Sequence, residues 1–190
     1  MSSLYDVIVV GVGSMGASTC FNMAERGVRV LGLEQGLLPN PEASFAGATR
    51  VIRLSYSEHP DYVPLLQRAY DLWEVLEDRT GRGLLHLTGA TYMGSPDSDT
   101  VSGALLSAKQ HGLAHSFLSH DELAERWPQF RLPEMFVGVH EEQAGYLLSE
   151  QAVAAYVEQA LLNGADLRGN QEVVEWKAVQ GEVMVRTKNE

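Results

Sequence analysis

The motif Gly11-Val12-Gly13-Ser14-Met15-Gly16 constrains the fold of this 190-residue chain more than any other feature. It follows a β-branched run at residues 5–10 and opens a helical pattern that ends at Gly27. A second apolar run, residues 28–33, closes with Glu34. Strands that are apolar throughout are buried on both faces, as in a parallel sheet. The order strand, glycine turn, helix and strand therefore predicts a βαβ unit of an α/β fold.

Each residue of the glycine motif has a place in binding a dinucleotide. Gly11 permits the tight turn, Gly13 lets the backbone approach a pyrophosphate, and Gly16 lets the helix pack closely on the strand. Ser14 and Met15 open the helix, whose N-terminal N–H groups and dipole favour a phosphate. The motif therefore predicts that these residues contact a dinucleotide cofactor. A glycine-rich turn without a ligand is the alternative.

The acid after the second strand extends this prediction to the ribose. A carboxylate at that place accepts hydrogen bonds from ribose hydroxyls, so we expect Glu34 and the adjoining Gln35 to bind the adenosine half. The negative charge would repel a 2′-phosphate, which disfavours NADP. The motif alone does not choose between NAD and FAD.

The rest of the chain departs from an NAD-binding domain, which usually continues with more βα units. Residues 35–49 have no hydrophobic period and predict a long loop. A third parallel strand is expected near residues 165–167. We further expect helices over 61–78, 101–110 and 120–126, and a strand over 84–93. Extended chain should follow the last of these helices up to Leu148. After it we expect a helix capped by Ser149 and ended by Gly164, and a hairpin of strands 172–176 and 182–187.

Composition excludes several classes of function. The chain has 14 Lys and Arg against 25 Asp and Glu, a net charge of −11, which argues against a nucleic-acid partner. It has no apolar run of about 18 residues, and its N-terminus lacks the basic start of a signal peptide, so we expect no membrane partner and a cytoplasmic location. Cys20 is expected to be a small buried residue, and the six histidines lack metal-ligand spacing.

Several motifs in a fixed order resemble one family over nearly the whole chain. They are the glycine motif with its strand, Thr49-Arg50-x-x-Arg53, Tyr62-Val-Pro-Leu65 before Leu72-Trp73, Leu87-Thr88-Gly89, Arg126-Trp127-Pro128, and Gly145-x-Leu-x-Ser-Glu150. With these motifs the sequence resembles the monomeric sarcosine oxidase and N-methyltryptophan oxidase family, a branch of the D-amino-acid-oxidase-like flavoenzymes.

The resemblance implies an α/β fold with a Rossmann-like FAD-binding domain and a mostly antiparallel α+β substrate domain. On this basis we expect residues 1–83 and 145–190 to belong to the FAD domain and 84–144 to the substrate domain. The implied reaction is FAD-dependent oxidation of the C–N bond of a secondary amine or N-methyl amino acid to an imine, with O2 reduced to H2O2. A dehydrogenase with another acceptor and a non-catalytic nucleotide-binding subunit are the alternatives.

The resemblance also assigns roles to individual residues. Arg53 would clamp the substrate carboxylate, and Arg50 would place a positive charge beside the flavin; these two are the expected catalytic residues. Ser44 and Thr49, in the same loop, would contact the cofactor, and the backbone at Val173 would lie against the adenine. Two surface arginines held in ion pairs are the alternative for Arg50 and Arg53.

The chain departs from the family in two respects. Family members commonly have His-His between Ser44 and Gly47 and an acid before Thr49, where this sequence has Phe45-Ala46 and Ala48. The C-terminal portion of the family fold is also not in the sequence. We therefore expect the chain to be the N-terminal half of such an oxidase, inactive alone, with the C-terminal half as its partner.

Overall fold

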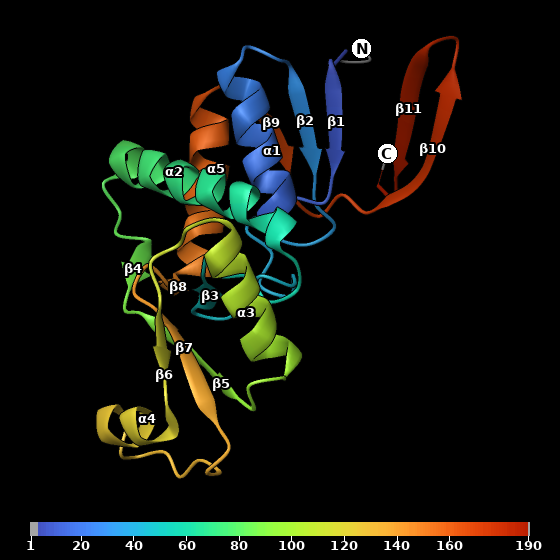
Figure 1. Cartoon of the computed structure of the whole chain (residues 1–190). Helices are drawn as coiled ribbons and strands as arrows, with labels where there is room; N and C mark the ends of the chain where they lie inside the picture. The colour runs from blue at the N-terminus through green and yellow to red at the C-terminus, as the bar shows by residue number, and fades with distance from the viewer. Residues whose placement is uncertain (1–3, 190) are drawn as a thin grey trace. The chain divides into compact units, whose positions relative to one another are not determined.

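The computed structural model describes residues 4–189 and divides them into two compact units (Figure 1). The first unit contains the residues up to Thr49 and those from Leu148 onward, and the second contains Arg50–Leu147.

A parallel sheet forms the first unit, in the order β1 (Val7–Val10), β2 (Val30–Leu33), β9 (Asp166–Arg168). All four residues of the central strand β2 are buried, which explains its unbroken apolar sequence. The expected βαβ unit and the third parallel strand are confirmed.

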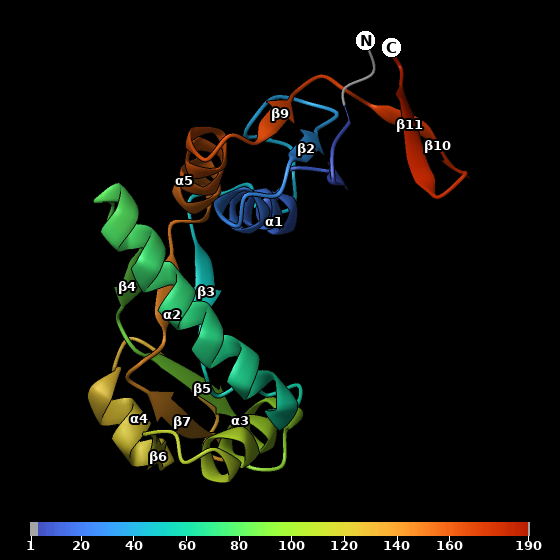
Figure 2. The same ribbon diagram turned by 90° about the horizontal axis from the view of Figure 1, so that it is seen from above.

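Helices α1 (Ser14–Glu25) and α5 (Ser149–Leu162) lie on the same side of this sheet (Figure 2). They pack against each other, with the rings of Phe21 and Tyr156 5.5 Å apart. Cys20 is fully buried as expected, and burial raises the pKa of its thiol to about 11. Gly27 and Gly164 follow the helices with φ of +76° and +89°, the left-handed conformation of a helix end.

Two local expectations for the first unit have different outcomes. The tail hairpin is confirmed as β10 (Val173–Val179) and β11 (Glu182–Thr187), with Gln180 and Gly181 at positive φ in its turn. The expected cap of α5 is wrong: the Ser149 hydroxyl donates instead to the carbonyls of Phe45 and Gly47, at 3.1 and 2.8 Å.

The second unit contains two antiparallel sheets. One has the order β3 (Arg50–Ile52), β8 (Gly145–Leu147), β4 (Leu85–Leu87), and the other β5 (Ala90–Gly94), β7 (Val137–Glu141), β6 (Ser116–Leu118). The prediction of one strand over residues 84–93 is wrong. Gly89, at φ +74°, separates β4 from β5, and the N–H groups of Thr88 and Gly89 both donate to the carbonyl of Ala144.

Four helical segments complete the second unit: η1 (Pro60–Tyr62), α2 (Val63–Thr80), α3 (Asp99–Gln110) and α4 (His120–Arg126). The capping box of α4 is confirmed, because Ser119 and Glu122 bond reciprocally. A core of Tyr92, Val101, Ala104 and Val139 joins α3 to β5 and β7.

The borders of these units differ from the domain borders expected from the sequence. Helix α2 belongs to the second unit, where the hydroxyl of Tyr70 donates to the carbonyl of Gln143 at 2.7 Å. Which unit binds cofactor and which binds substrate stays a prediction. Among the described residues, no helix is both long enough and apolar enough to cross a bilayer.

A buried histidine links three elements of the second unit. His140 on β7 bonds Thr91 of β5 through Nδ1 at 2.8 Å, and Arg126 of α4 donates to its Nε2 at 3.1 Å. Burial, followed by the Arg126 charge, lowers the pKa of His140 below its ordinary 6.5. Because a guanidinium can only donate, Nε2 acts as an acceptor in this contact, which favours the neutral imidazole.

We expect this histidine to make the second unit acid-sensitive. The unfolded chain takes up the proton first, so the stability from neutral His140 is full above pH 6.5 and is lost as the pH falls towards the lower folded pKa. The His140→Gln variant should be less stable at about pH 7.5 but lose less stability on going to about pH 5.5. Urea unfolding at both pH values measures this, and His59→Asn, at an exposed histidine, is the control. An equal loss of unfolding free energy between the two pH values in wild type and His140→Gln would contradict the prediction.

Candidate functional site

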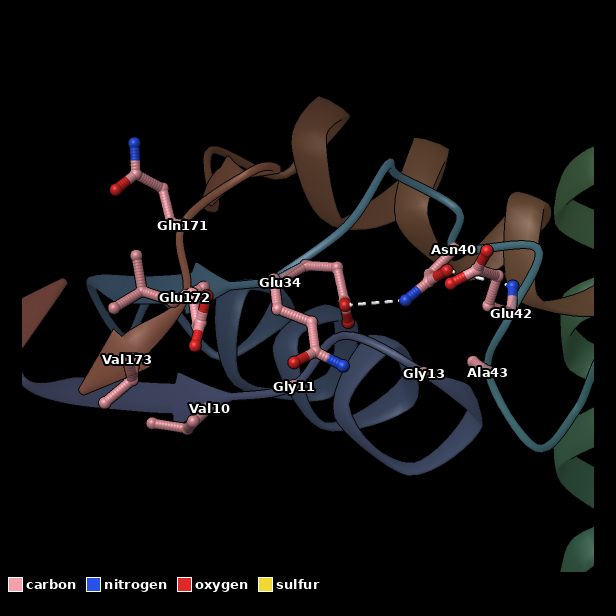
Figure 3. A pocket seen from close by; sticks show the side chains of 12 residues that line it. Val10, Gly11, Gly13, Glu34, Asn40, Glu42, Ala43, Gln171, Glu172 and Val173 are labelled. Carbon is pink, nitrogen blue, oxygen red and sulfur yellow. Dashed lines mark hydrogen bonds between the residues drawn. The ribbon is translucent and has the colours of Figure 1, made fainter. Parts of the chain in front are cut away.

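A cavity of about 470 Å³ lies beside the glycine turn in the first unit. This volume is in the range of small-molecule sites. In Figure 3, Gln171, Val173 and Val10 lie towards one end of the view and Asn40, Glu42 and Ala43 towards the other, with Glu34 between them. The cavity is lined by Val10, Gly11, Gly13, Leu33, Glu34, Gln35, Asn40, Glu42, Ala43, Gln171, Glu172 and Val173.

The glycine turn has the tight geometry that its sequence requires. Gly11 has φ +87°, and its N–H donates to the carbonyl of Leu33 at 2.8 Å. A Cβ on Gly16 would lie 1.9 Å from the Gly11 carbonyl oxygen, which is backbone and cannot move aside. A Cβ on Gly13 would meet only side chains at 3.8 Å or more. Gly11 and Gly16 therefore build the turn, while Gly13 leaves its backbone exposed to the cavity.

Helix α1 begins at this turn with its amide groups available. Helix geometry gives the N–H groups of Ser14, Met15 and Gly16 no carbonyl partner within the helix. Gly13 is the N-cap residue of α1, and among the described residues no side chain forms a capping hydrogen bond there. The first turn of the helix contains no acidic residue. The helix end is therefore suited to an anion such as a phosphate.

The carboxylate of Glu34 connects the turn to the loop that follows β2. Its Oε2 accepts from the N–H of Val12 at 2.9 Å, and its Oε1 accepts from the N–H of Gly36 at 3.1 Å. The same Oε1 also accepts from Asn40 Nδ2 at 2.9 Å (Figure 3). A carboxylate has about four acceptor positions, so these bonds use most of its capacity. Burial by itself would raise the pKa of Glu34, but these hydrogen bonds outweigh it and hold the pKa below its ordinary value.

The loop over residues 43–49 is fixed by the start of α5. Ser149 donates to two of its carbonyls, and the N–H of Gly47 donates to Glu150 Oε1 at 2.8 Å. Phe45, one of the departures from the family pattern, is 5% exposed and lies next to Gly13. Ser44 and Thr49 belong to this loop and are not among the described residues that line the cavity.

Arg50 and Arg53 belong to the second unit. Arg50 lies on β3 opposite Leu147 and is exposed. The guanidinium carbon of Arg53 lies 4.8 Å from the ring centroid of Tyr56 and 5.7 Å from that of Tyr92. Rings at these distances attract a guanidinium and restrict its movement.

The hydrogen-bonding groups of Arg53 are only partly used. Its Nη2 donates to Glu58 Oε1 at a long 3.5 Å, and its buried Nε has no hydrogen-bond partner among the described residues. The side chain is 26% exposed. Arg53 thus presents a fixed cation with donors to spare, which suits an anionic ligand.

The structure brings five of the expected cofactor residues together: Gly11, Gly13, Glu34, Gln35 and Val173 all line the cavity. Sequence reasoning missed Asn40, although its place between two prolines in a loop near Glu34 was a signal. It also missed Glu141, a buried acid of β7 that accepts from the N–H groups of Leu54 and Ser55 and that no local motif marks. Ser149 and Glu150 were recognised as part of a motif but not as anchors of the loop.

The chain matches known proteins over nearly its whole length. The model of the family described as FAD dependent oxidoreductase matches residues 6–190. Monomeric sarcosine oxidase of Streptomyces avermitilis is 40% identical over 98% of this chain and 49% of its own length. N-methyl-L-tryptophan oxidase of Yersinia pestis is 33% identical over 96% of this chain and 49% of its own length. The chain thus spans about half the length of these curated relatives.

Solved structures show the same fold. NikD, described as an unusual amino acid oxidase essential for nikkomycin biosynthesis, matches with a TM-score of 0.88 and 30% identity, over 99% of this chain and 49% of NikD. L-proline dehydrogenase from P. horikoshii matches with a TM-score of 0.83 at 20% identity, over 100% of this chain and 50% of that one. The expected α/β fold is therefore confirmed.

Proposed function

The chain belongs to the FAD-dependent oxidoreductase family, whose members bind FAD, and we propose that its first unit holds the adenosine diphosphate half of that cofactor. The observation that carries this proposal is the cavity that Gly13, Glu34 and Val173 line beside the start of α1. The residues present fit the group, because the helix end offers N–H groups to the pyrophosphate and the carboxylate of Glu34 lines the cavity in which a ribose hydroxyl would lie. Val10 and Val173 would supply apolar contact to the adenine.

We further propose the reaction of the protein that contains both halves of the family fold. Bound FAD supplies an acceptor for a hydride equivalent from the carbon next to the amine nitrogen. The substrate would be a secondary amine or an N-methyl amino acid, which becomes an imine, and O2 would be reduced to H2O2. The names of the relatives, sarcosine oxidase and N-methyl-L-tryptophan oxidase, support this substrate class. The C-terminal half would complete the active site.

In this proposal Arg50 and Arg53 of the second unit each interact with a different negative charge. Arg53 would bind the substrate carboxylate with the donors that Glu58 leaves unused, and the rings of Tyr56 and Tyr92 would keep the guanidinium in place. Arg50 would stabilise negative charge on the reduced cofactor.

The carboxylate site can be tested on the chain itself with N-methylglycine as the probe. The Arg53→Lys variant should weaken its binding by about tenfold or more, because an ammonium cannot form the two parallel hydrogen bonds of a guanidinium. Saturation-transfer NMR of the N-methyl protons measures this affinity. Arg68→Lys, at an exposed arginine of α2, is the matched control and should bind as wild type does. Equal affinity in Arg53→Lys and wild type would contradict the assignment.

The reaction needs a separate test in the polypeptide that contains both halves. Anaerobic addition of an N-methyl amino acid should bleach the flavin absorbance, and air should restore it with one H2O2 released per turnover. Bleaching without peroxide would favour a dehydrogenase with another acceptor. A bound flavin that no amine bleaches would favour a non-catalytic nucleotide-binding subunit.

A further inference from the structure

A buried acid of the second unit holds the backbone directly after Arg53. Glu141, the last residue of β7, is 1% exposed. Its Oε1 accepts from the N–H of Leu54 at 2.7 Å, and its Oε2 accepts from the N–H of Ser55 at 2.8 Å. Both oxygens of one carboxylate are thus used on two consecutive amides that lie more than eighty residues earlier in the chain.

The carbonyls of the same segment are also bound by side chains. The hydroxyl of Tyr92 on β5 donates to the carbonyl of Ser55 at 2.6 Å, and that of Ser107 on α3 donates to the carbonyl of Tyr56 at 2.5 Å. Residues 53–56 lie outside the strands and helices, so side chains from β5, β7 and α3 take the place of ladder hydrogen bonds. These three side chains therefore hold the segment, together with its own bond from the N–H of Tyr56 to the carbonyl of Leu54 at 2.7 Å.

This anchored segment determines where the Arg53 side chain stands. Tyr92 is both the donor to Ser55 and one of the two rings beside the guanidinium, and the other ring, Tyr56, lies at the end of the segment. A shift of Leu54 and Ser55 would therefore move the guanidinium relative to both rings.

An ionised carboxylate suits this task better than any uncharged side chain. A buried charge is costly unless it is hydrogen-bonded, and one amide N–H group on each oxygen offsets part of this cost for Glu141. A glutamine offers one acceptor oxygen and would turn its NH2 group towards the second N–H. An acid at this position is thus matched to fixing two adjacent amides at once.

From these contacts we infer that Glu141 is a positioning residue, which holds the backbone of Leu54 and Ser55 so that Arg53 is placed to receive the carboxylate of the substrate. The inference rests on the proposed role of Arg53. The residue acts through the backbone and touches neither substrate nor cofactor in this account. Its loss should therefore change carboxylate binding and leave cofactor binding in the first unit intact.

The test compares Glu141→Gln with Glu142→Gln, which makes the same chemical change at the exposed neighbouring residue. The readouts are the Arg53 Nε–H signal in the 1H–15N NMR spectrum of the chain, and the affinities for N-methylglycine and for FAD. We expect Glu141→Gln to move the Arg53 signal towards that of mobile arginines and to weaken N-methylglycine about tenfold, with FAD affinity unchanged. Glu142→Gln should match wild type in all three.

Two further variants keep the inference open to refutation if Glu141→Gln does not fold. Glu141→Asp retains both carboxylate oxygens and should restore part of the affinity. Tyr92→Phe keeps the ring but removes the bond to Ser55, and should weaken N-methylglycine by a smaller factor. A folded Glu141→Gln or Tyr92→Phe with the wild-type Arg53 signal and affinity would overturn the inference. If the Arg53 signal of the wild-type protein does not respond to N-methylglycine, the proposed role of Arg53 is overturned. The shift of that signal in Glu141→Gln would still test whether Glu141 positions Arg53.

Discussion

Gly16→Ala is expected to unfold the first unit, with a loss of about 4 kcal/mol or more in the free energy of unfolding. The new Cβ would lie 1.9 Å from the oxygen and 2.9 Å from the carbon of the Gly11 carbonyl. Both atoms are backbone, and Gly11 is itself held by its bond to Leu33. Relief of the clash would require the end of β1 and the start of α1 to separate, which would disrupt the βαβ unit. Urea unfolding measures the effect.

Gly13→Ala separates the cofactor role of the motif from its structural role. Its Cβ would meet only the Phe45 ring at 3.8 Å and Ala43 at 4.0 Å, and the backbone φ of −78° suits any residue. We expect the variant to fold like wild type but to lose FAD affinity by about a hundredfold, because the methyl group would stand where the pyrophosphate approaches. Gly83→Ala, with nothing within 4 Å of its new Cβ, should change neither property.

A Gly16→Ala protein with the stability of wild type would contradict the structural role assigned to Gly16 in the turn.

Glu34→Ala should have the second largest effect, a loss of about 3 kcal/mol at neutral pH, because it leaves three donors without their acceptor. Two of them, Val12 N–H and Asn40 Nδ2, are in buried surroundings. The folded pKa of Glu34 is depressed, so its contribution is present above the ordinary glutamate pKa and is lost as the pH falls through the folded value. The stability difference between wild type and Glu34→Ala should therefore shrink in acid.

Urea unfolding at neutral pH and near pH 3 checks this prediction. Glu42→Ala is the matched control, because Glu42 lines the same cavity but is exposed. Equal stability of Glu34→Ala and Glu42→Ala at neutral pH would show that the carboxylate does not hold the turn. A difference that persists unchanged in acid would show that its charge is not involved.

The parts of the fold that the sequence predicted are those set by neighbouring residues. The βαβ unit follows from two apolar strands around a glycine turn, the hairpin from the Gln180-Gly181 turn, and the start of α4 from its capping box. Strands β3 and β6 were not predicted. Each has three residues, too few to show a period, and each is defined by its pairing: β3 with the distant strand β8, and β6 with β7 across an intervening helix.

The residues of the candidate site also fall into two groups, those that a local motif predicts and those that only long-range contacts bring together. The glycine motif and Glu34 could be found from the sequence because turn, helix start and acid follow one another within a short stretch. The contacts of Glu141 with Leu54 and Ser55, and of Ser149 with Phe45 and Gly47, join residues that the sequence separates by 86 to 104 positions. No local pattern marks such partners, so Ser149 could be mistaken for a helix cap.

The central claim, that the cavity beside Gly13 holds the adenosine diphosphate half of FAD, is tested most directly by calorimetric titration of the chain with FAD. We predict one FAD bound per chain, competition by ADP but not by riboflavin, an affinity about a hundredfold lower in Gly13→Ala, and an unchanged affinity in Glu142→Gln. A folded chain that binds no FAD, or binds it equally well with and without the Gly13 substitution, would contradict the claim.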